Sequence, residues 1–126
     1  MTDKLTELRT ALDSLDDEII ALLERRFEIS GRVAAAKNGS ATVRPGREAA
    51  IMRRLQSAAP DLDPAVLAGV WRHIFSASVA QQQGSLRIAT HHDSLVTAHW
   101  HFANSATFDV IDDVDRLLDA VPRQAD

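Results

Sequence analysis

The stretch of sequence that decides the fold is residues 5–37, LTELRTALDSLDDEIIALLERRFEISGRVAAAK. Its apolar residues recur in alternating steps of three and four, which is the period of a helix with one apolar face. We call this set the apolar seam, and its members are Leu5, Leu8, Leu12, Leu15, Ile19, Leu22, Ile29, Val33 and Ala36. Asn38-Gly39-Ser40 interrupts the pattern, so we predict one long helix that ends near Lys37.

The length of this helix predicts a second copy of the chain. A helix rises about 1.5 Å per residue, so residues 5–37 would span about 50 Å. A compact domain of some 84 residues measures only roughly 30 Å across. Because one subunit cannot bury the whole seam, we predict a homodimer in which a partner helix covers it.

Two shorter helices are predicted after the long one. Pro45 suits the first turn of a helix, and this second helix ends before Pro60. Asp63-Pro64 is typical of an N-cap residue followed by proline, and the third helix should run to about Gln83, with Gly84 as its stop. The inner side of the third helix is expected to consist of Leu67, Val70, Trp71, Ile74, Phe75, Ser78 and Gln82.

After residue 84 the pattern changes to a short α/β segment. Residues 86–90 and 107–111 are predicted to be strands, and residues 93–103 and 113–121 are predicted to be helices that begin with aspartate caps. Two strands alone form a marginal sheet. We therefore expect this βαβα segment to pack on the helical body or to pair with another copy of itself.

Together these elements predict a mainly all-α chain in two parts. Residues 1–84 form a helical domain of three helices, intertwined with the same domain of the partner copy. Residues 85–126 form a small C-terminal βαβα appendage, which we call the tail.

Composition places the chain among ordinary globular proteins. Of its 126 residues 45% are hydrophobic and 25% are charged, and the absence of cysteine excludes disulfides and thiolate chemistry. Residues 1–84 carry 11 basic and 11 acidic side chains, and residues 85–126 carry 3 and 7, so the net charge of −4 resides in the tail. This distribution argues against a nucleic-acid partner. No signal core and no apolar run of membrane-spanning length is present, so we expect a cytoplasmic protein without a membrane partner.

Arg26 occupies a position of the seam where the pattern expects an apolar side chain. A buried guanidinium needs an anionic partner, because an uncompensated charge in an apolar interior costs several kcal/mol. Lys37 follows 11 positions later, on nearly the same helix face and about 16 Å along the axis. We interpret the two cations as one side of an anion-binding pocket. The alternative is a structural ion pair of Arg26 with Asp16 or Glu48, with Lys37 at a fraying helix end.

Three further groups are candidates for the same pocket. Arg9 points about 100° away from Arg26, so it does not easily share a pocket with Arg26 of its own helix but could complete the pocket of a partner copy; the alternative is an ordinary surface arginine. Arg47-Glu48 opens the second helix, where free backbone N–H groups and the arginine fork both favour an anion. Ser78 and Gln82 lie four residues apart on the third helix, and inward polar groups need hydrogen-bond partners. The alternative is that the apolar stripe ends there in solvent.

Four histidines cluster in the tail, at positions 91, 92, 99 and 101. His99 and His101 are two residues apart on a predicted helix and face different directions, which does not match two metal ligands on one helix. With no cysteine and no acidic residue at a recognisable ligand spacing, we predict that the chain binds no metal. The sequence also has no motif of a nucleophilic hydrolase and no glycine-rich phosphate loop.

Taken together, these residues resemble the all-helical chorismate mutases, including mutase domains that are fused to prephenate dehydratase. The resemblance covers about residues 5–84, two thirds of the chain, and the ordered combination of motifs is specific although each motif alone is weak. The stretches that carry it are Leu8-Arg9, Leu15-Asp16, Leu22-Leu23-Glu24-Arg25-Arg26, Val33-Ala34-Ala35-Ala36-Lys37, Arg47-Glu48 and Ser78-Val79-Ala80-Gln81-Gln82.

The resemblance implies an enzyme that rearranges chorismate to prephenate in aromatic amino acid biosynthesis, with no cofactor. It implies a homodimer with active sites shared between the subunits. In each site Arg26 and Arg47 of one subunit, with Arg9 of the other, would clamp the two carboxylates of chorismate.

The resemblance also assigns the remaining polar positions. Lys37 and Gln82 would donate hydrogen bonds to the ether oxygen of the substrate. Glu48 would accept a hydrogen bond from the ring hydroxyl, and Ser78 would lie beside a carboxylate. One departure is Arg44, which stands where members of the family often have an acidic residue, and it puts the binding of the hydroxyl in question more than the reaction.

The tail resembles the opening βαβα of a prephenate dehydratase domain. In that family a loop of the type Gly-Pro-x-Gly-Thr follows the first strand, whereas here the loop reads Thr90-His91-His92-Asp93-Ser94. The tail is therefore expected to be a truncated dehydratase start without catalytic activity.

Two other functions stay open at this point. One is an isochorismate pyruvate lyase on the same scaffold, although the lyase type is apolar where Glu48 stands here. The other is a non-catalytic dimeric helical module that regulates a partner enzyme, which the sequence does not identify. The retention of every cationic position argues against the second alternative.

Overall fold

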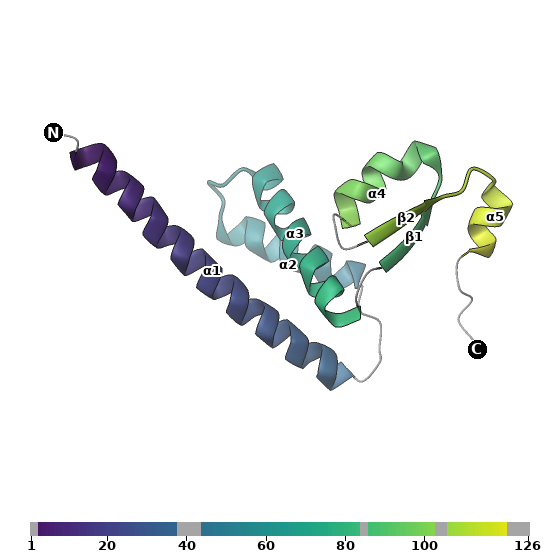
Figure 1. The fold of residues 1–126 in the computed structure, drawn as a ribbon, viewed down its shortest axis with the longest axis horizontal. Coiled ribbons are helices and arrows are strands. Elements are labelled where there is room, and N and C mark those ends of the chain that lie inside the picture. The colour runs from purple at the N-terminus through teal and green to yellow at the C-terminus, as the bar shows by residue number, and fades with distance from the viewer. Residues whose placement is uncertain (1–2, 38–43, 84–85, 103–105, 121–126) are drawn as a thin grey trace. The chain divides into compact units, whose positions relative to one another are not determined.

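The computed structural model describes residues 3–37, 44–83, 86–102 and 106–120 (Figure 1). The elements follow in the order α1, α2, α3, β1, a 3-10 turn η1, α4, β2 and α5. The predicted mainly α-helical fold with a small C-terminal α/β segment is confirmed. By compactness the chain divides into two units, residues 1–39 and residues 40–126, and the predicted domain boundary after residue 84 stays a prediction.

The first unit contains α1, Asp3–Lys37, a single helix of 35 residues as predicted. Asp3 in its first turn and Lys37 in its last turn both suit the helix dipole. No residue of α1 is buried, and the Leu, Ile and Val side chains of the apolar seam are between 44% and 59% exposed. The predicted stop at Asn38-Gly39-Ser40 lies outside the described residues.

The second unit begins with α2, Pro45–Ala58, and α3, Pro64–Gln83, which pack against each other. Both helices begin with proline, as the sequence predicts. Asp63 is the N-cap of α3, since its Oδ1 accepts a hydrogen bond from the backbone N–H of Ala65 at 2.9 Å. The predicted stop of α3 at Gly84 lies outside the described residues.

The core of the second unit lies along α3. Its buried apolar side chains are Leu67, Ile74, Phe75 and Val79, and Ser76 and Ser78 are buried polar residues. Val70, which the helical period places on the inner side of α3, is 48% exposed in the single chain. α3 contacts α2 and also α4 and β1, so it buries more than the single stripe that the helical period indicated.

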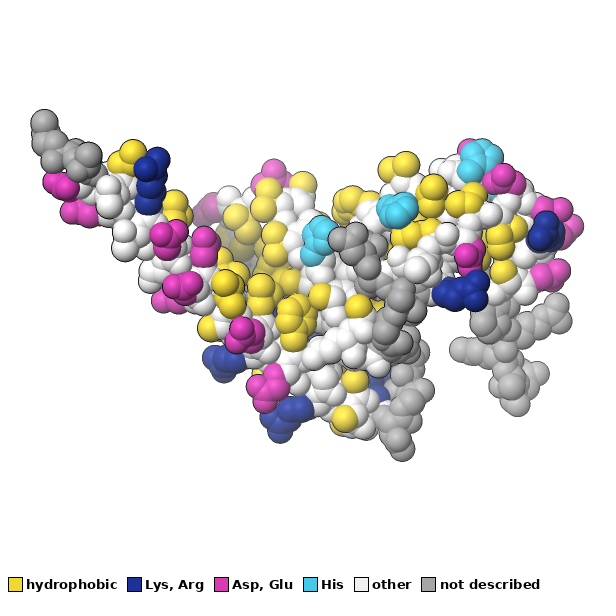
Figure 2. Space-filling view, viewed as in Figure 1, with side chains coloured by type: hydrophobic (Ala, Val, Ile, Leu, Met, Phe, Trp, Pro, Cys, Tyr) yellow, Lys and Arg dark blue, Asp and Glu magenta, His cyan; other side chains and the backbone are white. Residues whose placement is uncertain are grey.

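The tail forms a two-stranded parallel sheet with a helical connection. β1, Leu86–Thr90, pairs with β2, Ala106–Val110, in a register that joins Thr90 to Val110. α4, Leu95–Phe102, connects the strands, and β1 and α4 both contact α3, which confirms that the tail packs on the helical body. α5, Val114–Asp119, follows after β2, and its acidic surroundings account for the negative side chains around that end of the tail in Figure 2.

The two tail helices begin differently. Asp113 caps α5 as predicted, because its Oδ1 accepts hydrogen bonds from the N–H groups of Asp115 and Arg116. The predicted cap of the other helix, Asp93, is wrong: it lies inside the 3-10 turn η1, His92–Ser94, and His91 is the N-cap. Within the described residues, no helix is both long and apolar enough to cross a bilayer.

Candidate active site

α1 carries the three predicted cations of the first unit. Arg26 and Lys37 are half-buried, whereas Arg9 is exposed. Because α1 is one helix, Arg26 and Lys37 lie on nearly the same face, separated by about 16 Å along its axis. Arg9 lies on a different face of the same helix, as its spacing predicts.

The other predicted site residues belong to the second unit. Arg47 and Glu48 lie in the first turn of α2, where Arg47 is exposed and Glu48 is half-buried. Ser78 is buried near the end of α3, and Gln82, one turn later, is half-buried. The structure thus confirms the helix positions of these residues, and their assembly with the cations of α1 into one pocket stays a prediction.

Two local details qualify the predicted roles. The Ser78 hydroxyl donates a hydrogen bond to the carbonyl of Ile74 at 3.0 Å, so its oxygen lone pairs rather than its proton face other partners. Arg44 is the N-cap of α2, and a guanidinium has no acceptor with which to cap a helix. An acidic residue at this position would both cap α2 and stand near Glu48, so Arg44 changes the charge at the start of α2.

Glu48 forms an ion pair that the sequence analysis missed. Its Oε2 accepts a hydrogen bond from Nη1 of Arg72 at 3.2 Å, and the two side chains are only 15% and 21% exposed. The partners lie 24 residues apart, on α2 and α3. A signal was present, because Arg72 is the only lysine or arginine in the 20 residues of α3.

Arg72 also contacts the tail. The guanidinium carbon of Arg72 lies 5.5 Å from the centre of the Trp100 ring, on α4. This distance suits a cation–π interaction. Two residues later, the carbonyl of Phe102 accepts a hydrogen bond from the hydroxyl of Ser76, one turn beyond Arg72. α4 is therefore anchored to α3 by contacts on both sides of this turn.

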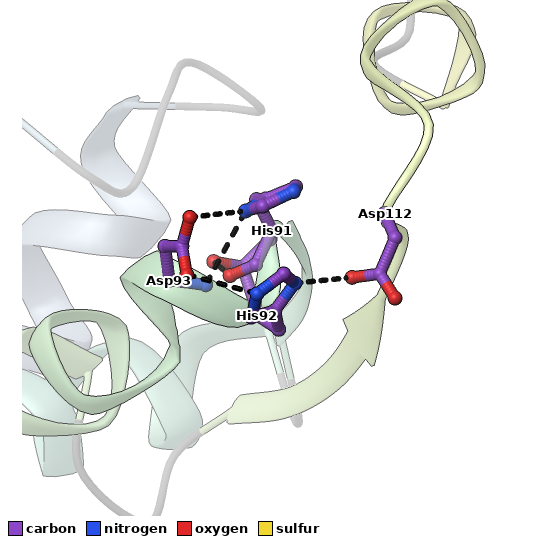
Figure 3. A network of polar contacts seen from close by, with 5 residues as sticks. His91, His92, Asp93 and Asp112 are labelled. Carbon is purple, nitrogen blue, oxygen red and sulfur yellow. Dashed lines mark hydrogen bonds and ion pairs between the residues drawn. The ribbon is translucent and has the colours of Figure 1, made fainter.

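A second polar cluster lies at the carboxyl ends of the two strands (Figure 3). His92 contacts Asp112 through Nδ1 at 2.8 Å and Asp93 through Nε2 at 2.9 Å, and His91 lies 3.4 Å from Asp93. Because both ring nitrogens of His92 face carboxylates, the doubly protonated ring is favoured. The hydrogen bond with Asp112, followed by the charge of Asp93, raises the pKa of His92, and the same hydrogen bond lowers the pKa of Asp112.

This cluster contains the described residues that come closest to a metal site. Donor atoms of His91, His92 and Asp112 lie within 4.8 Å of one another, and two imidazoles with one carboxylate suit a divalent transition metal. The ion pairs to Asp93 and Asp112 account for the same arrangement of side chains. The expectation that the chain binds no metal stays a prediction.

Replacing Asp112 by asparagine is expected to lower the pKa of His92 towards its usual value near 6.5. The bridge stabilises the tail below that value and is lost as the pH rises through the raised pKa of His92. At the acid end it is lost as the pH falls through the lowered pKa of Asp112. NMR titration of the His92 ring measures the effect. Asp119→Asn is the matched control, and an unchanged His92 titration in Asp112→Asn would contradict the assignment.

The chain is similar to known proteins over most of its length. Residues 8–83 match the family described as chorismate mutase type II. The chain is also 32% identical, over 127 residues, to the bifunctional chorismate mutase/prephenate dehydratase of Neisseria gonorrhoeae strain FA 1090. That similarity covers 94% of this chain and 34% of the relative, so it continues past residue 83 into the tail, and the chain spans about a third of the relative's length. No solved structure is significantly similar to the chain.

Proposed function

The chain belongs to the chorismate mutase type II family, and we propose on this basis that it catalyses the rearrangement of chorismate to prephenate. The observation that carries the proposal is the match over residues 8–83, within which every predicted substrate-binding position is polar or charged as the reaction requires. The reaction belongs to aromatic amino acid biosynthesis, and the cytoplasmic location stays a prediction.

The chemistry needs no nucleophile and no cofactor, because the rearrangement is intramolecular. The enzyme has to hold the flexible enolpyruvyl arm over the ring in the reactive geometry. Arg26 and Arg47 bind the two carboxylates of chorismate, and a guanidinium can hold a carboxylate through two parallel hydrogen bonds. This clamp fixes the substrate conformation before any bond breaks.

Negative charge grows on the ether oxygen as the carbon–oxygen bond breaks. Lys37 and Gln82 donate hydrogen bonds to this oxygen, and donors that are oriented in advance stabilise the transition state more than the substrate. The half-buried state of both side chains supports this role, because partial exclusion of water strengthens such hydrogen bonds. Glu48 accepts a hydrogen bond from the ring hydroxyl of chorismate, and Ser78 lies beside one of the substrate carboxylates.

The active site is shared between two subunits of a homodimer. What supports the dimer is the apolar seam of α1, which runs from Leu5 to Ala36 without a buried side chain. A soluble protein seldom leaves so continuous an apolar surface open to water. Arg9 lies on another face of α1 than Arg26, so it completes the site of the partner subunit.

A product assay with the purified full chain tests this function. Incubation with chorismate is expected to yield prephenate at an unchanged rate in the presence of a metal chelator. Arg26→Ala should lower kcat/KM by about 30-fold or more, because losing one partner of a hydrogen-bonded charge pair costs roughly 2–5 kcal/mol. Arg25→Ala, which changes the exposed neighbour, is the matched control. Release of pyruvate would identify a lyase, and no turnover would favour a non-catalytic module.

A further inference from the structure

Arg72 lies between a residue of the proposed site and the tail. On one side its Nη1 donates to Oε2 of Glu48 at 3.2 Å, and on the other its guanidinium carbon is 5.5 Å from the Trp100 ring. The side chains of Arg72 and Glu48 are mostly buried, at 21% and 15% exposed. α2, α3 and the tail therefore meet around this one guanidinium.

The physical consequence concerns the conformation of Glu48. A glutamate has three side-chain torsions, and restricting them on binding a ligand costs free energy. An ion pair restricts Glu48 in advance only if its partner is itself held in place. Arg72 meets this condition, because its planar guanidinium lies near the indole of Trp100 and its side chain is only 21% exposed.

Trp100 is itself 58% exposed, and its position is set by the attachment of α4 to α3. α4 contacts α3, and the hydroxyl of Ser76 donates a hydrogen bond to the carbonyl of Phe102. His101, which lies between Trp100 and Phe102 on α4, is half-buried. Burial, followed by the positive charge of Arg72, lowers the pKa of His101. A neutral His101 therefore adds no second positive charge beside Arg72 near neutral pH.

We propose that Arg72 is a positioning residue that holds Glu48 in the orientation needed to accept the ring hydroxyl, and that Trp100 of the tail holds Arg72. This inference rests on the proposed function. It gives the tail a role in the mutase reaction that needs no contact between Trp100 and the substrate. The tail thereby acts on substrate binding through two successive side-chain contacts.

Steady-state kinetics of the full chain test the proposal. The hydroxyl is bound in the substrate and in the transition state alike, so Arg72→Gln should raise KM about fivefold to tenfold and leave kcat within about twofold. Trp100→Ala should raise KM about threefold, and Trp100→Phe, which keeps an aromatic face, should restore it. Arg54→Gln, at an exposed arginine of α2, is the matched control and should change neither constant.

A double-mutant cycle separates positioning from a general loss of structure. In a Glu48→Gln background, Arg72→Gln and Trp100→Ala should have almost no further effect on KM, because the residue that they position is already changed. Additive effects would overturn the proposal. A parent chain without chorismate turnover would refute the proposed function instead.

A readout without substrate keeps the two questions apart. The indole N–H signal of Trp100 in an NMR spectrum is assigned by its loss in Trp100→Phe. Glu48→Gln should shift this signal, since releasing one side of Arg72 alters its contact with the ring. An unmoved Trp100 signal in Glu48→Gln would overturn the connection between Glu48 and the tail, whether or not the chain is active.

Discussion

Mixing Arg9→Ala chains with Arg26→Ala chains is expected to restore activity that neither variant has alone. In the proposed shared site, Arg26 of one subunit acts with Arg9 of the other. A mixed dimer therefore contains one pocket with both arginines intact and one pocket with both replaced. With random exchange, half of the dimers are mixed, so about a quarter of all sites should be active.

The spacing along α1 supplies a sharp control for this experiment. Arg26 and Lys37 lie on nearly the same face of one helix, so both should serve the same pocket. Mixing Arg26→Ala with Lys37→Ala should then leave every pocket with a lesion and restore nothing. Recovery in this second mixture, or none in the first after verified subunit exchange, would refute the proposed division of the site between the subunits.

Gln82→Glu is expected to make kcat/KM depend on pH, with higher values at lower pH. A neutral amide donates a hydrogen bond at any ordinary pH, whereas a carboxyl group donates only while it is protonated. An ionised carboxylate would also repel the charge that develops on the ether oxygen. Near neutral pH we expect kcat/KM to fall by about 10²–10³, the usual effect of losing one such donor, and to recover as the pH is lowered.

Profiles of kcat/KM against pH for the parent, Gln82→Glu and Gln81→Glu decide the matter. Gln81 is exposed and next in sequence, so its variant controls for a new carboxylate in this turn and should follow the parent. The positive charge of Lys37 would lower the pKa of the new carboxyl group, and burial would raise it, so the expectation concerns the direction of the pH effect. Superimposable profiles for Gln82→Glu and the parent would remove Gln82 from the site.

Local patterns in the sequence predicted the helices well because their signals lie within one element. The seam predicted α1, and Asp63 and Asp113 predicted the starts of α3 and α5, since an aspartate cap acts over two or three residues. The start of α4 was less predictable. There the carboxylate of Asp93 contacts His92, and the backbone N–H of Asp93 donates to Nδ1 of His91, so His91 and not Asp93 is the cap.

Contacts between elements were beyond the sequence patterns. Periodicity gave α3 one inner stripe, but Val79 and Ser76 are buried as well, and Ser76 bonds the carbonyl of Phe102 in the tail. The pairing of Arg72 with Glu48 depends on how α2 and α3 cross, which no spacing along the chain encodes. The helix positions of the predicted site residues could be derived from sequence, whereas the partner of Glu48 required the structure.

In the proposed homodimer, the apolar seam of α1 makes the stability of the fold depend on the protein concentration. If a second copy covers this seam, separation of the subunits leaves its Leu, Ile and Val side chains 44–59% open to water, as they are in the single chain. Mass action then governs folding and catalysis together, because an obligate homodimer often has no stable folded monomer. Dilution should lower the activity per chain and the melting temperature in parallel, and a cell that makes too little of the protein would lose the fold along with the reaction.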